Sequence, residues 1–246
     1  MNMNSFEELK HLPRFTIGSI KLKDLIFNYN DPLAFYNEYN DVFVNEIYRF
    51  NSSIPSPLIL DVGGYIGLTV MYFKTLFPQA EITVFEPDPT IFGLLKKNIS
   101  GGGYRKVTMV KAGVGKEKRK LSFYPSGSDG GNFYHRVQGS PVEVEILKLS
   151  DFINQPIDLL KINIEGMEGD VFEEIEYKLP FVKEIIFEYH AFYSLPQCLG
   201  KILTILDRNH FRYIIADVPC ARTPVPFQIG MNYKYFNLVY ATKISG

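Results

Sequence analysis

The first residues suited to ligand chemistry form a glycine loop that follows a short apolar run. Leu58–Val62 leads into Asp61–Gly67, which reads D-V-G-G-Y-I-G. Glycine at such a turn lets a ligand approach the backbone closely. The dinucleotide fingerprint G-x-G-x-x-G would need glycine where Tyr65 and Leu68 stand. The spacing therefore indicates either a ligand loop of another class or a plain tight turn between a strand and a helix.

The next apolar run, Glu81–Phe85, is followed directly by an acidic residue, Glu86. A carboxylate at the end of the second strand can accept hydrogen bonds from both hydroxyls of a ribose. Enzymes that bind nicotinamide cofactors use the same device, so Glu86 supports an adenosine ligand without choosing between cofactor classes. The alternative is a solvated carboxylate at a strand end.

A third pattern combines a strand, a turn and a helix start. Ile157–Ile164 alternates apolar and polar residues toward its end, and Gly166 marks the turn that follows. Ligands in open α/β sheets bind at the carboxyl ends of strands, so we expect Asn163 and Glu165 in the site. Glu168 falls in the first turn of the next helix, where the helix dipole favours an acid, and we expect it to cap that helix.

The chain also offers a general base at a strand end. His190 follows the predicted strand Glu184–Tyr189, and histidine exchanges protons near neutral pH. Glu188 lies two residues earlier on the same face of that strand and is expected to orient the imidazole. The alternative is a His–Glu pair with a purely structural role.

These residues need a sheet that brings strand ends together. From Leu58 onward apolar strands alternate with helices, which predicts an α/β fold with a mostly parallel, doubly wound sheet over residues 58–246. Two further strands, at 121–124 and 142–147, predict a β insertion with a glycine-rich loop between them. Residues 1–57 differ, since Asp31 and the proline after it start a helix whose aromatic residues recur at helical spacing. We interpret them as a helical cap.

Composition limits the function classes. The chain has 246 residues and a formal net charge of -1, which gives no electrostatic case for nucleic acid or an anionic membrane surface. The polar N-terminus lacks a signal-peptide core, and no run approaches the about 18 apolar residues of a membrane span. Two distant cysteines, Cys198 and Cys220, form no disulfide framework. We expect a cytoplasmic protein; the oligomeric state is not predicted.

Taken in order, four segments resemble the FkbM-type methyltransferase family. That family shows D-V-G-x-N-x-G, F-E-P, K-I-D-V-E-G-x-E and a strand ending in E-x-H. The corresponding segments here are Asp61–Gly67, Phe85–Pro87, Lys161–Glu168 and Glu188–His190, within roughly residues 58–190. Tyr65 stands where the family has asparagine, and Asn163 where it has aspartate. An amide neither ionises nor binds metal strongly, so we expect no metal site.

The resemblance implies a Rossmann-like class I methyltransferase sheet with an antiparallel last strand, and S-adenosylmethionine as cofactor. It places the ammonium end of the ligand at Asp61, the ribose at Glu86 and the adenine beside the segment after the third strand. The implied cofactor-binding residues are Asp61, Gly63, Gly64, Tyr65, Gly67, Glu86, Pro87, Ala112 and Gly113. The implied catalytic residues are Asn163, Glu165 and His190.

The function that follows is methylation of a hydroxyl group on a small molecule, sugar or lipid, with His190 or Glu165 removing the hydroxyl proton. A non-catalytic protein that keeps the fold and the cofactor is one alternative, raised by Tyr65 and Asn163. A nicotinamide-dependent oxidoreductase is the other. The acceptor pocket is expected from the N-terminal cap, the 125–140 loop and residues 219–236.

Overall fold

The computed structural model of the chain describes residues 3–22, 24–134, 140–192, 194–216 and 234–244. Cys220, most of the 219–236 segment and part of the 125–140 loop therefore lie outside the described residues. Within the described part, no helix combines the length and the apolar character that a membrane crossing needs.

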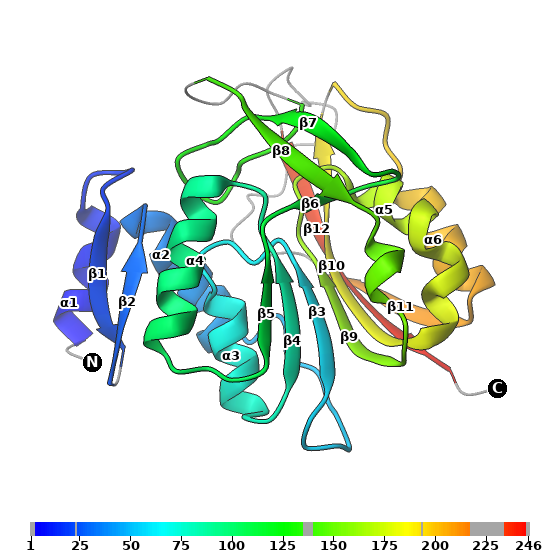
Figure 1. Cartoon of the computed structure of the whole chain (residues 1–246), viewed down its shortest axis with the longest axis horizontal. Coiled ribbons are helices and arrows are strands. Elements are labelled where there is room, and N and C mark those ends of the chain that lie inside the picture. The colour runs from blue at the N-terminus through cyan, green and yellow to red at the C-terminus, as the bar shows by residue number, and fades with distance from the viewer. Residues whose placement is uncertain (1–2, 23, 135–139, 193, 217–233, 245–246) are drawn as a thin grey trace.

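A seven-stranded sheet forms the centre of the molecule, in the order β11-β12-β10-β9-β3-β4-β5 (Figure 1). Neighbouring strands are parallel except at β12, which runs antiparallel to both β10 and β11. This confirms the mostly parallel sheet with an antiparallel last strand. The strands are β3 (Leu58–Val62), β4 (Glu81–Phe85), β5 (Val107–Val110), β9 (Ile157–Ile162), β10 (Val182–Phe192), β11 (Phe211–Ala216) and β12 (Lys234–Lys243).

Helices cover both faces of this sheet. Alternate residues of β3 point to opposite faces: Ile59 packs in one core cluster with α3 and α4, and Leu60 packs in the other with α5 and α6. Every residue of β9 is buried, as expected for a parallel strand between two helical layers. The helices are α3 (Leu68–Leu76), α4 (Pro89–Gly101), α5 (Glu168–Ile175) and α6 (Leu199–Arg208), with 3-10 turns η3 (Leu149–Phe152) and η4 (Glu176–Phe181).

The predicted β insertion is present as a separate small sheet. Its strands are β6 (Gly113–Val114), β7 (Arg119–Phe123) and β8 (Val142–Leu147), in the order β6-β8-β7. Phe123, Val144 and Ile146 form its own small core. The insertion lies above the carboxyl ends of the central strands (Figure 1), so it roofs the edge where a ligand would bind.

The N-terminal segment is only partly the predicted helical cap. It contains α1 (Met3–Glu8), η1 (Leu9–His11), a hairpin of β1 (Gly18–Leu22) and β2 (Leu25–Tyr29), α2 (Pro32–Tyr39) and a π-helical turn η2 (Asn40–Val44). The hairpin was not predicted. The helix begins as predicted, with the Asp31 carboxylate accepting from two backbone N–H groups. It ends before Phe50, because Glu46 has a φ of 51° that no right-handed helix accommodates.

Candidate active site

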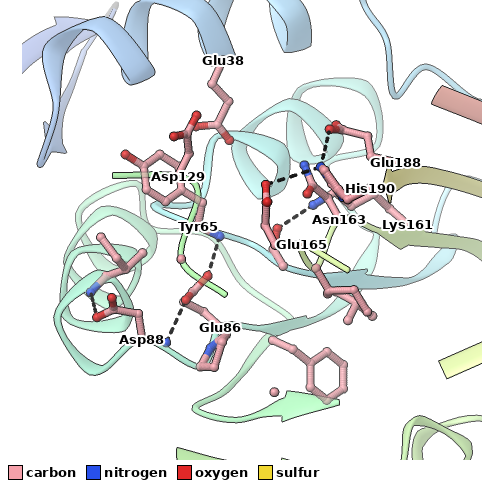
Figure 2. A pocket seen from close by; sticks show the side chains of 18 of the residues that line it. Glu38, Tyr65, Glu86, Asp88, Asp129, Lys161, Asn163, Glu165, Glu188 and His190 are labelled. Atoms are coloured by element: carbon pink, nitrogen blue, oxygen red, sulfur yellow. Dashed lines mark hydrogen bonds and ion pairs between the residues drawn. The ribbon is translucent and has the colours of Figure 1, made fainter. Parts of the chain in front are cut away.

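A cavity of about 270 Å³ opens at the carboxyl ends of the central strands. Its walls come from the N-terminal segment, the glycine loop and the β insertion. The turns after β4 and β9, the end of β10 and the start of β12 complete them. Figure 2 shows Glu86 and Asp88 on one side of Tyr65, and Asn163, Glu165, Glu188 and His190 gathered on the other. The fold thus brings the predicted catalytic residues and most of the predicted cofactor residues to one cavity; Asp61, Gly64 and Gly67 are not in its lining.

The glycine loop is shaped by close packing beneath it. A side chain at Gly63, which has a φ of 84°, would place its Cβ 1.8 Å from the carbonyl oxygen of Asn163. At Gly64 a Cβ would lie 2.1 Å from Val84, and at Gly67 it would lie 2.9 Å from Leu95. Gly63 and Tyr65 line the cavity. At Gly64 and Gly67 a side chain would point into the core, where there is no room for it.

Asp61 lies below the loop, fully buried. It accepts a hydrogen bond from Thr69, and its Oδ1 is 3.0 Å from the Lys161 ammonium. Lys161 also donates to the carbonyl of Gly63 at 2.6 Å. Asp61 therefore braces the loop through Lys161, and a direct contact of Asp61 with a ligand stays a prediction.

Glu86 stands in the cavity wall beside the loop. Its two carboxylate oxygens accept hydrogen bonds from the backbone N–H groups of Tyr65, at 3.0 Å, and Asp88, at 2.9 Å. Burial is the main reason that the pKa of Glu86 is raised to about 8, and the nearby charge of Asp88 adds to it. Pro87, Ala112 and Gly113 line the same part of the cavity. A buried acceptor flanked by small residues suits a ribose beside a flat ring.

His190 is buried among three glutamates. Its Nδ1 lies 2.9 Å from Oε1 of Glu168, and its Nε2 lies 3.4 Å from Glu165 and 3.8 Å from Glu188. The short contact to the imidazole therefore comes from Glu168, and Glu188 lies farther from the ring. Glu188 instead accepts a hydrogen bond from the hydroxyl of Tyr48. Glu168 holds the ring and also accepts from the Gly166 backbone N–H at 3.2 Å. It lies in the first turn of α5 as expected, but both contacts are outside the helix, so helix capping stays a prediction.

The turn after β9 directs two of the predicted residues into the cavity. Glu165 and Gly166 both have left-handed backbone, with φ of 57° and 105°. Asn163 lies just before this turn, and its side-chain amide approaches the Tyr48 hydroxyl at 3.5 Å. Asn163 and Glu165 both line the cavity. Glu165, in the turn after β9, lies 3.4 Å from His190 near the end of the neighbouring strand β10.

Comparison with known proteins decides the family. Residues 61–213 match the Methyltransferase FkbM domain, which is more than half of the chain. The chain belongs to the FkbM methyltransferase family. The match contains the glycine loop, Glu86, the turn after β9 and His190, so each segment of the predicted resemblance falls within it.

Relatives of the family support methyltransferase activity. The 31-O-demethyl-FK506 methyltransferase FkbM of Streptomyces tacrolimicus is 24% identical over 221 residues, which are 73% of this chain and 82% of that protein. Methyltransferase 1 of Beauveria bassiana is 26% identical over 189 residues, covering 65% of this chain and 76% of the relative. The 2-O-methyltransferase NoeI of Sinorhizobium fredii is 26% identical over 157 residues, covering 55% and 64%.

Solved structures show the same fold at low identity. Methyltransferase FkbM from Methylobacillus flagellatus has a TM-score of 0.51 and 15% identity, and the alignment covers 98% of this chain and 58% of that one. M. jannaschii TYW2 in complex with AdoMet has a TM-score of 0.52 and 10% identity, covering 95% and 89%. They confirm the Rossmann-like class I fold.

Tyr65 departs from the FkbM pattern in the glycine loop. Its φ of 45° is a left-handed conformation that asparagine adopts more readily than tyrosine. The Tyr65 hydroxyl donates to the side chain of Asn30, and Asn30 in turn donates to the carbonyl of Gly127 at 2.8 Å. Tyr65 thereby connects the cofactor loop, the N-terminal segment and the loop of the β insertion.

The cavity residues that the sequence did not assign to the site include Glu38, Asp41 and Tyr48 of the N-terminal segment. The sequence predicted that the N-terminal segment would contribute to the acceptor pocket, but it did not predict which residues would do so. No short motif contains them, because they meet the site only after the chain has folded.

Proposed function

We propose that this FkbM family member is an S-adenosylmethionine-dependent O-methyltransferase whose acceptor is a hydroxyl group of a small molecule, sugar or lipid. The observation that supports it most is the common cavity. One wall has a buried carboxylate beside a glycine loop, and the other has a buried histidine held by a carboxylate.

The residues fit the cofactor on chemical grounds. Glu86 has two buried carboxylate oxygens, each with a lone pair left for a ribose hydroxyl. Ala112 and Gly113 leave room for the adenine, and the loop at Gly63 allows the amino-acid end to approach the backbone. When bound, S-adenosylmethionine supplies a methyl group on a sulfonium and leaves as S-adenosylhomocysteine.

On the opposite wall, His190 takes the proton of the acceptor hydroxyl. An ionised carboxylate only accepts hydrogen bonds, so Glu168 requires the proton of neutral His190 on Nδ1 and leaves the Nε2 lone pair as the base. The methyl group would come from the cofactor held by the glycine loop and Glu86, and the acceptor oxygen would receive it as His190 removes its proton. Glu165, 3.4 Å from Nε2, stabilises the imidazolium that results.

Transfer of a labelled methyl group tests this function. The chain is incubated with S-adenosylmethionine labelled in its methyl group and with panels of hydroxylated sugars, lipids and small alcohols. We expect label in an ether, which survives mild base that cleaves methyl esters. Label found only in esters or on nitrogen would contradict O-methylation. The His190→Gln variant should bind S-adenosylhomocysteine and lose the transfer.

A further inference from the structure

The wall of the cavity away from Glu86 is built largely by parts of the chain outside the catalytic motifs. Glu38 comes from α2, Asp41 from η2, and Asp129 from the loop of the β insertion. Glu38 and Asp41 also precede residues 61–213, the range that matches the family domain. They therefore lie outside the segments that carry the predicted cofactor residues, and we assign this wall to the acceptor.

This wall is acidic. Glu165 and Glu188 add two carboxylates to those of Glu38, Asp41 and Asp129. The described lining residues include two that can carry positive charge, and both are already engaged. They are Lys161, 3.0 Å from Asp61 and 2.6 Å from the carbonyl of Gly63, and His190, 2.9 Å from Glu168.

Glu38 is a residue of this acidic wall with one carboxylate oxygen that no described residue hydrogen-bonds. Its Oε2 is inaccessible to solvent and has no hydrogen-bond partner among the residues that the structure describes. Burial raises the pKa of Glu38 well above its usual range; the charge of Lys161 opposes this rise, and the charges of Asp129, Asp61 and Glu188 add to it. Figure 2 shows Glu38 and Asp129 together on one side of Tyr65. A carboxylate oxygen that is buried without a hydrogen-bond partner is costly, and a bound cation would offset the cost.

We propose that the acceptor carries a protonated amine, which binds at Glu38 and Asp129 while its hydroxyl lies at His190. This inference rests on the proposed function. Phosphorylated or carboxylated acceptors would meet a wall of like charge and be rejected. The sulfonium of the cofactor is a second positive charge that could account for the acidic wall, so the test must remove it.

Binding of charge-matched probes in the presence of S-adenosylhomocysteine, whose sulfur is neutral, provides that test. One triad is glucosamine, glucose and glucuronate, and the other is tyramine, 4-ethylphenol and 4-hydroxyphenylacetate. The three probes of a triad have similar size and shape and differ mainly in their net charge. We expect the amine of at least one triad to bind about tenfold or more tightly than its neutral and acidic counterparts, the effect of one good charge pair. Ligand-observed NMR measures this difference in the millimolar range.

Variants locate the preference. Glu38→Gln and Asp129→Asn should each lower amine affinity by about fivefold or more, whereas Glu143→Gln, at an exposed carboxylate of the β insertion, should not change it. Titration with S-adenosylhomocysteine verifies that each variant is folded.

The outcomes separate the two proposals. If S-adenosylhomocysteine binds and neither amine binds more tightly than its neutral counterpart, the amine acceptor is ruled out and the methyltransferase proposal stands. The same holds if an amine binds but the Glu38 and Asp129 variants bind it equally well. If S-adenosylhomocysteine itself does not bind the folded chain, the proposed function fails first.

Discussion

His190 and Glu168 form a buried pair that joins the end of β10 to the start of α5, with Nδ1 2.9 Å from Oε1. Neither side chain is appreciably exposed. Since a carboxylate can only accept, the shorter contact to Glu168 favours the proton on Nδ1 over Nε2, which faces Glu165 and the cavity. The pair has the arrangement in which a carboxylate positions a general base.

The Glu168→Gln variant tests this positioning role. A glutamine amide can donate to Nδ1, so His190 should lose its preference for the Nδ1–H tautomer, and methyl transfer should fall about 100-fold. The ¹⁵N spectrum of histidine-labelled protein reports the tautomer directly. Glu173→Gln, at a surface position of the same helix, is the control. An unchanged tautomer in Glu168→Gln would remove Glu168 from the positioning role.

Cofactor affinity should depend on pH through Glu86. The pKa of about 8 keeps this carboxyl mostly protonated at about pH 6, whereas two ribose hydroxyls donate only to its ionised form. Binding then releases a proton, so affinity for S-adenosylhomocysteine should rise by up to about tenfold per pH unit and level off above about pH 8. Calorimetry across this range measures the slope. Glu86→Gln cannot titrate and should bind weakly with no such slope; a slope that persists in it would assign the titration to another group.

The central sheet could be predicted because its strands are short, uninterrupted apolar runs followed by turn residues. Leu58–Val62 and Ile157–Ile162 are examples, and helices bury both faces of each. The β1–β2 hairpin could not be predicted in this way. It buries Phe27 and Tyr29 against aromatic residues of other segments but leaves Ile26 59% exposed, so its pattern is weak without its partners.

The Tyr65 hydroxyl should contribute to stability. Tyr65→Phe leaves the buried side-chain oxygen of Asn30 without this donor, which should lower the free energy of unfolding by about 1–2 kcal/mol. Urea unfolding monitored by circular dichroism measures the change. In Tyr36→Phe the lost hydrogen bond to Glu7 is exposed, so we expect a change below about 0.5 kcal/mol. If both substitutions lowered the free energy of unfolding equally, the buried hydrogen bond to Asn30 would contribute no more to stability than the exposed one to Glu7.

The buried ion pair below the glycine loop should be sensitive to the loss of one partner. Lys161→Met leaves Asp61 buried without its cation, which should cost about 3–5 kcal/mol of unfolding free energy. Lys183, whose side chain is 58% exposed, pairs with Asp158 at 2.6 Å; because water screens this cation, Lys183→Met should cost at most about 1 kcal/mol. Guanidinium unfolding compares the two variants. A loss for Lys161→Met no larger than that for Lys183→Met would contradict the bracing role of the pair.

The site was predictable where function lies in contiguous motifs, and less so elsewhere. Glu86, Glu165 and His190 stand at strand ends, where topology alone brings them together. Tyr48 contacts Glu188 from 140 residues away, and no local pattern encodes that contact. The choice of Glu168 over Glu188 as the partner of His190 depends on how the turn at Gly166 places α5, which spacing along β10 cannot reveal.

Titration of the purified chain with S-adenosylhomocysteine tests the central claim most directly. We predict saturable binding, weakened by about 2–3 kcal/mol in Glu86→Ala because charged hydrogen bonds to the ribose are lost. Glu81→Ala, at the exposed start of the same strand, should bind as the unmodified chain does. No binding by the folded protein, or equal binding by Glu86→Ala, would contradict the assignment of this cavity as the cofactor site.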